Sequence, residues 1–158
     1  MVNYLFKENK ISRIPETEQE RYVSFYENSY LDDLEHCKFN LTLFPRWSII
    51  SGYYAMHDIS KLFIAKVYRI KIDRDVHATT ITLIKELAKD KEILSLIEKG
   101  YEEYKNLANE LEQGKRERVK AQYYTGTEFS KERYKKFSNE FYNKIVLPYT
   151  EKIKKLIK

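Results

Sequence analysis

The sequence has few cysteines, glycines and prolines and no long apolar run. A single cysteine, Cys37, in 158 residues excludes an internal disulfide framework and a cysteine-rich zinc site, which favours a reducing cytoplasm. Because the apolar runs span only a few residues, no transmembrane helix is expected, and residues 1–10 lack the apolar core of a secretory signal. The length fits one domain with a single sizeable core. We therefore expect a cytoplasmic globular protein without membrane association.

Several kinds of catalytic site are also missing. The sequence has no glycine-rich phosphate loop, no G-x-S-x-G nucleophile motif and no H-E-x-x-H zinc motif. Its glutamate and histidine residues do not recur at the spacing of a di-iron site. We therefore expect neither a metal nor a cofactor.

Four glycines and three prolines leave few breaks, which favours long helices. Asn-Gly and Asp-Gly turns are absent and no apolar alternation persists, so strands are not expected. Capping residues and prolines place the helix ends. The expected helices run from Thr17, as a cap, to about residue 43, from Pro45 to about 68, from 76 to 89 behind Asp75 as a cap, from 90 or 91 to about 124, and from Ser130 to 158 with a kink or break at Pro148.

These elements predict an all-α, up-and-down antiparallel bundle of about five helices over residues 17–158, with residues 1–16 as an N-terminal extension. The helix over 45–68 is apolar around most of its circumference, so we expect it at the centre of the bundle. Gly52 has no side chain and would let a neighbouring helix approach that helix closely.

Polar residues interrupt one apolar stripe of the helix over 45–68. At about 100° per residue, Tyr54, His57 and Lys61 fall on one stripe together with isoleucines. Asp58 lies beside the stripe, where it could pair with Lys61 or with Arg118. We predict that these residues line a cavity that either contains Arg118 or lies at a subunit interface. The alternative is that His57 is a satisfied core histidine.

The excess positive charge lies in the last third of the chain. Residues 101–158 carry 14 Lys/Arg and 9 Asp/Glu, whereas residues 1–100 carry 15 of each. A basic region rich in tyrosine fits a nucleic acid, because cations neutralise phosphates and rings stack on bases. The alternative is a solvated lysine-rich helix face.

Arg118 lies near the centre of the apolar face of the expected fourth helix, which Tyr104, Leu107 and Leu111 define. An arginine is rarely buried without a partner, because removing its charge from water costs several kcal/mol. We therefore predict that Arg118 meets a carboxylate, backbone carbonyls, a second subunit or an anionic ligand such as phosphate. If the helix outruns the core at this point, Arg118 lies in water instead.

Three segments, in this order, resemble the HEPN family, most closely its small stand-alone archaeal and bacterial members. Tyr53-Tyr54-Ala55-Met56 resembles the family's YYAM segment, and Asp75-Val76-His77 resembles its short helix opened by a histidine. The segment Arg118-Val119-Lys120-Ala121-Gln122-Tyr123 is similar to the pattern R-x-x-A-D-Y, with glutamine in place of aspartate. Together with the helical pattern, the resemblance covers about residues 17–158.

The resemblance implies a helical bundle that forms dimers. Many members are metal-independent ribonucleases or toxins with an Arg-x4–6-His motif from both subunits, some pair with a nucleotidyltransferase antitoxin, and others bind RNA or nucleotides. In this chain no histidine follows Arg118, because His36, His57 and His77 all lie upstream. Glutamine and tyrosine cannot act as a general base at neutral pH. The ribonuclease motif is therefore expected to be degenerate.

We expect a homodimer that binds RNA or nucleotides without cleaving them, with a nucleotidyltransferase antitoxin as partner if it belongs to a toxin–antitoxin system. One alternative is a ribonuclease toxin, with Arg118 holding the phosphate and His57 or His77 replacing the missing base. The other is a structural or protein-binding bundle. The predicted phosphate- or RNA-binding residues are Lys115, Arg116, Arg118, Lys120, Gln122 and Tyr123.

Overall fold

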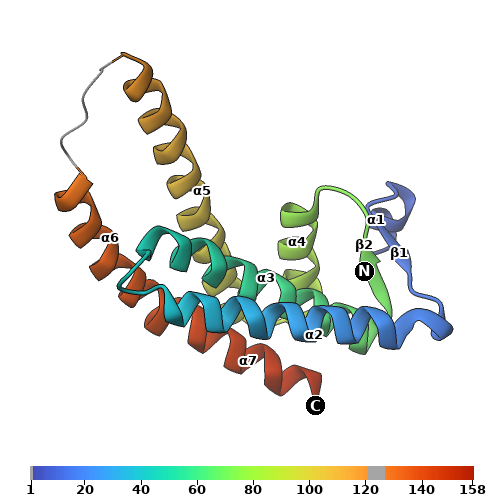
Figure 1. The fold of residues 1–158 in the computed structure, drawn as a ribbon. Coiled ribbons are helices and arrows are strands. Elements are labelled where there is room, and N and C mark those ends of the chain that lie inside the picture. Colours follow the sequence, from blue (N-terminus) through green and yellow to red (C-terminus); the bar gives the residue numbers. More distant parts are fainter. Residues whose placement is uncertain (1, 121–126) are drawn as a thin grey trace.

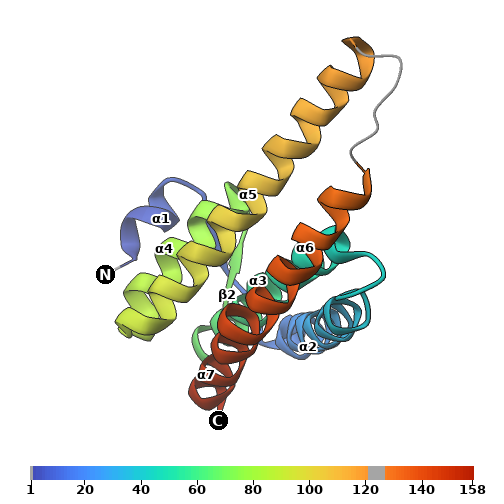
Figure 2. The ribbon, with the colours of Figure 1, turned by 90° about the vertical axis from the view of Figure 1, so that its left-hand side faces the viewer.

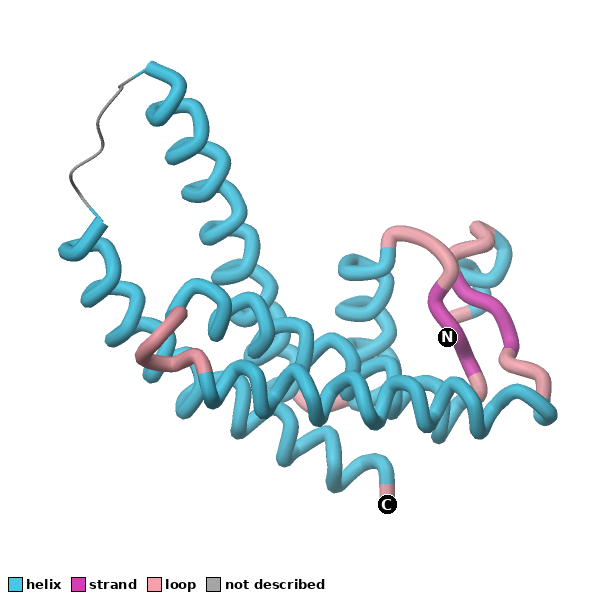
Figure 3. Tube along the Cα trace, in the orientation of Figure 1, coloured by secondary structure: helices cyan, strands magenta, loops and turns pink. Residues whose placement is uncertain are grey.

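The protein is an α-helical bundle with one small two-stranded sheet (Figures 1 and 3). A computed structural model describes the backbone of residues 2–120 and 127–158 and the side chains of residues 2–109 and 132–158. The elements are α1 (Asn3–Lys7), β1 (Ile11–Arg13), α2 (Glu16–Phe39), α3 (Pro45–Tyr68), β2 (Ile70–Ile72), α4 (Val76–Ala88), α5 (Lys91–Lys120), α6 (Thr127–Phe141), the π-helical turn η1 (Tyr142–Val146) and α7 (Leu147–Ile157). The predicted all-α bundle is confirmed.

Helix α3 is the central helix, as its all-round apolar sequence predicts. It packs against α2, α4, α5, α6 and α7. In Figure 2, α2 is seen nearly along its axis, whereas α5 and the α6–α7 segment lie across the picture. The α2–α3 pair therefore crosses α5 and the α6–α7 segment at a large angle. Helix α3 is the member of the pair that packs against both of them. Among the described residues, no helix is long and apolar enough to cross a membrane.

Gly52 lies where α3 is closest to its neighbours. A Cβ atom at this position would lie 2.9 Å from Cys37 Sγ of α2 and 2.9 Å from Val146 Cγ2 of η1. The predicted close approach is therefore confirmed. Cys37 is fully buried beside this contact, and burial raises the pKa of its thiol to about 11.

Several predicted helix ends are confirmed. Pro45 occupies the first turn of α3, where its missing N–H costs nothing. Asp90 caps α5, since its Oδ1 accepts hydrogen bonds from the backbone N–H groups of Glu92 (2.8 Å) and Ile93 (3.1 Å).

Other predicted ends are wrong. Helix α2 starts at Glu16, directly after the extended Pro15, so Thr17 lies inside the helix, and α2 ends at Phe39 instead of near residue 43. Helix α4 begins at Val76 as predicted, but Asp75 does not cap it: the residue has a left-handed backbone (φ 48°) and its carboxylate pairs with Lys10. Helix α6 begins at Thr127 instead of after Ser130.

The predicted kink at Pro148 takes the form of a π-helical turn. Proline has no N–H, and its ring collides with the carbonyl one turn earlier. The turn η1 immediately before α7 widens the helix, and Leu147 N–H donates to the carbonyl of Tyr142. The helical path therefore continues past Pro148 into α7.

The N-terminal segment packs onto the bundle. Strand β1 pairs antiparallel with β2, with Ile11 opposite Ile72 and Arg13 opposite Ile70. Leu5 and Ile11 are buried in the core. The expectation of no strands is wrong for these two segments, because three residues are too few to show an alternating pattern.

Candidate functional site

A cluster of tyrosine and histidine rings lies where α3, α4 and α5 meet. We call it the ring cluster. Its members are Tyr53, Tyr54 and His57 of α3, His77 of α4, and Tyr101 and Tyr104 of α5.

Tyr53 is the centre of the ring cluster. Its ring centroid lies 4.7 Å from that of Tyr104, in a stacked arrangement, and within 6 Å of those of His77 and Tyr101. His77 in turn stacks on Tyr101 with ring centroids 5.6 Å apart and an interplanar angle of 13°. Three helices therefore hold the rings together in a mixture of stacked, tilted and edge-to-face contacts.

The ring cluster has a buried base and a half-buried outer layer. Tyr53 is fully buried and His57 is 2% exposed. The outer rings are each partly exposed to solvent: Tyr54, His77, Tyr101 and Tyr104. Among the described residues, the ring cluster therefore combines four partly exposed rings with the buried rings of Tyr53 and His57.

Hydrogen bonds fix the orientations of these rings. Tyr53 Oη lies 2.8 Å from His77 Nδ1, and Thr80 Oγ1 lies 3.1 Å from His57 Nε2. Burial lowers the pKa of both histidines, so both are neutral at pH 7. A hydrogen bond with Tyr104, together with burial, raises the pKa of Tyr54 to about 12. Tyr54 and both histidines are therefore uncharged at neutral pH.

A polar network continues from the ring cluster toward α2. Asp58 Oδ1 lies 3.2 Å from Lys61 Nζ, which is the pairing predicted between these residues, and Asp58 Oδ2 accepts a hydrogen bond from Ser29 (2.5 Å). Burial opposes the ionisation of Asp58, but its neighbours outweigh burial and lower its pKa. Burial, with the charge of Asp58 nearby, raises the pKa of Asp33 to about 6.

His57 belongs to the core of the protein. Its Nε2 faces Thr80, and its Nδ1 lies 3.6 Å from Asp58 Oδ1, too far for a hydrogen bond. Among the described residues, this Nδ1 has no hydrogen-bond partner. Because His57 is almost completely buried, it does not reach a ligand on the surface. His57 is therefore a core histidine, as the alternative expected, but Nδ1 lacks the partner that a satisfied core histidine would have.

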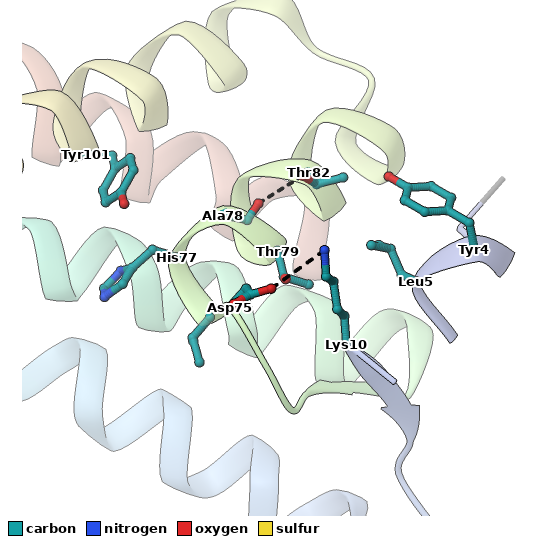
Figure 4. Close-up of a pocket in the computed structure, with 10 residues that line it drawn as sticks. Tyr4, Leu5, Lys10, Asp75, His77, Ala78, Thr79, Thr82 and Tyr101 are labelled. Carbon is teal, nitrogen blue, oxygen red and sulfur yellow. Dashed lines mark hydrogen bonds and ion pairs between the residues drawn. The ribbon is translucent and has the colours of Figure 1, made fainter. Parts of the chain in front are cut away.

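A pocket of about 400 Å³ adjoins the ring cluster at the start of α4. Figure 4 shows His77 and Tyr101 at one end of this pocket and Tyr4 and Leu5 at the other, with Lys10 between them. Lys10 Nζ is paired with two carboxylates, Glu8 at 3.0 Å and Asp75 at 3.6 Å. These carboxylates offset its charge, so the pocket offers no free cation to an anionic ligand at Lys10.

The structure brings together only part of the predicted site. Tyr54, His57, Asp58 and Lys61 are neighbours on α3, as predicted. The side chains of Lys115, Arg116, Arg118 and Lys120, which are positions of α5, lie outside the described residues, and so do Gln122 and Tyr123. The cavity predicted on α3 and its contact with Arg118 therefore stay predictions.

Sequence reasoning missed the tyrosines that complete the ring cluster. The stripe identified on the helix over 45–68 includes Tyr54 but not Tyr53, Tyr104 counts as part of an apolar face, and Tyr101 is not among the predicted site residues. The available signal was the i, i+3 spacing of Tyr101 and Tyr104, which places both rings on neighbouring parts of one helix face.

Among the described residues, no group of three or more His, Cys, Asp or Glu residues could hold a metal ion. Comparisons of the chain with protein-family models, curated proteins and solved structures found no match.

Proposed function

We propose that this protein binds single-stranded RNA or nucleotides through the outer rings of the ring cluster and does not cleave them. The observation that carries the proposal is the set of four partly exposed rings held by stacking and hydrogen bonds at the junction of three helices. The proposal agrees with what the resemblance to the HEPN family implies.

The physics of base stacking supports this choice of ligand. Every base has a π-face, and stacking of a base on an aromatic side chain contributes about 1–3 kcal/mol, with little dependence on sequence. Rings that are already fixed lose little entropy when a base stacks on them. His77 is neutral at pH 7, so it can stack on a base without the cost of desolvating a charge.

The position of the basic segment fits the same ligand. Lys115 and Arg118 each follow a ring-cluster tyrosine, Tyr101 or Tyr104, by 14 residues along α5. Fourteen residues are close to four helical turns, so these positions return to nearly the same side of α5, about 21 Å further along it. A strand whose bases stack on the rings could extend along α5 and place its phosphates beside these cations.

The test is a binding titration with a short single-stranded RNA and, separately, with ATP, at low salt. We expect Tyr101→Ala and Tyr104→Ala to weaken binding about tenfold each, because each removes one stacking surface. Tyr22→Ala is the matched control, since Tyr22 is a partly exposed tyrosine of α2 whose ring lies tilted beside that of Tyr26, with centroids 6.3 Å apart. The proposal fails if neither ligand binds, or if the control weakens binding as much as the two variants.

Salt dependence separates the rings from the basic segment. We expect Arg118→Ala to lower both the affinity and the slope of log K against log salt, because one phosphate contact is lost. Tyr104→Ala is expected to lower the affinity and leave the slope unchanged. Equal slopes for the two variants would remove Arg118 from the binding site.

One observation favours ribonuclease activity as a second candidate function. His77 is partly exposed, neutral at pH 7 and adjacent to the pocket, so it could accept a proton from a bound ligand. His57 is buried and lacks this access. If the protein cleaves RNA, His77→Ala should abolish cleavage even at RNA concentrations that saturate the variant, and should weaken binding no more than Tyr104→Ala does. The non-catalytic proposal instead expects no cleavage by the wild-type protein.

A further inference from the structure

The pocket beside the ring cluster extends the surface that the outer rings offer to a ligand. It shares His77 and Tyr101 with the cluster and continues to Tyr4 of α1, which is 45% exposed (Figure 4). Its volume of about 400 Å³ lies in the range of sites that hold one small molecule. The pocket therefore has room for a single nucleoside at the end of a strand, and not for a longer stretch of RNA.

The two threonines that line the pocket present hydrogen-bond acceptors. Thr79 Oγ1 donates its proton to the carbonyl of Arg74 (2.9 Å), and Thr82 Oγ1 donates to the carbonyl of Ala78 (2.9 Å, Figure 4). A hydroxyl group has one proton, so each of these oxygens keeps only its lone pairs for a ligand. The pocket therefore favours a ligand that donates hydrogen bonds.

Asp75 adds a carboxylate to these acceptors. An aspartate in front of a helix ordinarily accepts a hydrogen bond from the first N–H groups, but Asp75 has a left-handed backbone (φ 48°) and makes no such bond. Its side chain is 64% exposed and lines the pocket, with Oδ2 3.6 Å from Lys10 Nζ. Both carboxylate oxygens are therefore placed to accept hydrogen bonds from a ligand.

The charges of the pocket disfavour a phosphate group. Among the described residues, Lys10 and Asp75 are the charged side chains that line it, and Lys10 Nζ is also paired with Glu8 at 3.0 Å. One lysine thus balances two carboxylates. A phosphate placed here adds negative charge to this group, whereas a hydroxyl group brings no charge and donates a hydrogen bond.

We propose that the pocket binds the 3′-terminal nucleoside of a single-stranded RNA and that Asp75 accepts hydrogen bonds from its free 2′ and 3′ hydroxyl groups. This inference rests on the proposed function, because the preceding bases stack on the outer rings. A ribose diol supplies two donors to one carboxylate, and acidic side chains hold ribose hydroxyls in the same way in dinucleotide sites. The terminal base then lies toward Tyr4, and a 3′ phosphate is excluded.

Chemical changes at the RNA ends test the proposal. One short RNA is titrated at low salt with hydroxyl groups at both ends, with a 3′ phosphate, and with a 5′ phosphate. We expect the 3′ phosphate to weaken binding about tenfold or more, because it removes a donor and adds charge beside Asp75 and Glu8. The 5′ phosphate is the matched control and should leave the affinity within about twofold. A terminal 2′-deoxy nucleotide should weaken binding several-fold with no change of charge.

The outcomes separate this inference from the proposed function. An RNA that binds equally with either 3′ end overturns the terminal site and leaves RNA binding by the rings intact. If none of the RNAs binds, both the inference and the proposed function are overturned. Free adenosine carries the same diol, and it should displace the RNA only at far higher concentration because it lacks the stacked bases. Displacement by adenosine as readily as by RNA overturns the RNA end as the ligand.

Substitution of Asp75 assigns the preference for the 3′ hydroxyl to one side chain. Asp75→Asn should reduce this preference to about twofold, since asparagine removes the charge and tolerates a left-handed backbone. Asp73→Asn is the matched control and should keep the full preference, since Asp73 is exposed, pairs with Lys71 and is not among the described residues that line the pocket. An Asp75→Asn protein with an unchanged circular dichroism spectrum and the full preference overturns the proposal. If this variant does not fold, the titrations of the wild-type protein decide alone.

Discussion

The two sides of α3 differ in packing and in exposure. On the side that faces α2 and η1, Gly52 lets the neighbouring elements approach so closely that an added Cβ atom would collide. The hydroxyl groups of Ser48 and Ser51 on this helix are hydrogen-bonded. Ser48 Oγ, for example, donates to the carbonyl of Cys37 at 2.7 Å. On the side that faces α4 and α5, the same helix carries the large rings of Tyr53, Tyr54 and His57. The rings that they contact on α4 and α5 are partly exposed, and among the described residues the buried Nδ1 of His57 has no hydrogen-bond partner.

This difference separates residues that specify the fold from residues that remain available to a ligand. Close packing around Gly52 fixes how α3 packs against α2 and η1, because a close-packed interior leaves no room for added side-chain volume. The ring cluster keeps polar edges and partly exposed faces. Without a bound partner, these groups lower the stability of the fold. The contrast predicts which substitutions damage the fold and which change only its response to pH.

The largest effect is expected at Gly52. Gly52→Ala should lower the free energy of unfolding by about 2 kcal/mol, because the added Cβ collides with Cys37 and Val146 and overpacking outweighs the helix propensity of alanine. Gly100→Ala is the matched control on the ring side, since its Cβ would lie 2.9 Å from the flexible end of Met56 and at an ordinary contact distance of 3.8 Å from Tyr53. Urea unfolding should find Gly100→Ala neutral or stabilising. Equal losses would remove the contrast between the two sides.

A smaller effect is expected from acid on the ring side. The folded protein holds the pKa of His57 and His77 below the ordinary 6.5, so below about pH 6.5 the unfolded chain binds more protons. Stability should therefore fall as the pH falls from 7, with a slope approaching about 1.4 kcal/mol per pH unit for each such histidine. His57→Asn should flatten this slope in unfolding experiments between pH 7 and 5. An unchanged slope would mean that His57 is protonated in the fold.

The smallest effect is expected at Asp33, on the polar edge between the two sides. Its pKa is raised to about 6, so the ionised carboxylate is unfavourable in the fold above that pH, and the stability present below about pH 4 is lost as the pH rises through 6. Asp33→Asn should stabilise the protein at pH 8 by about 1 kcal/mol, after discounting for solvent screening, and by less at pH 4.5. Thermal unfolding of Asp33→Asn beside Asp32→Asn separates this effect from the removal of any acidic charge on α2.

Much of the fold could be predicted because its signals are local. Pro45 and Asp90 mark helix starts through their own backbone chemistry, and the apolar circumference of α3 follows from its sequence alone. Gly52 could be interpreted correctly because it interrupts that circumference with a missing side chain. Thr17 and Asp75 are residue types that often cap helices, but neither caps a helix here. Helix α2 begins directly after Pro15, and Asp75 pairs with Lys10.

The ring cluster could not be predicted as a unit because it is assembled from three helices. The sequence places Tyr53 and Tyr54 on adjacent positions, but only the packing of α4 and α5 brings His77 to 2.8 Å from Tyr53 and Tyr104 onto its face. The helical period correctly marked His57 and Lys61 as polar groups among apolar ones. It could not tell that His57 would be enclosed beside Thr80, whereas the pair of Lys61 with Asp58 is one of the two pairings that it predicted.

The burial of Cys37 has a practical consequence for experiments on this protein. Its sulfur lies in the contact between α2 and α3, and its raised pKa keeps it as an unreactive thiol at neutral pH. An alkylating reagent can reach the sulfur only when the two helices part. Because the chain has one cysteine, the rate of its modification measures how often this helix pair opens in the native state.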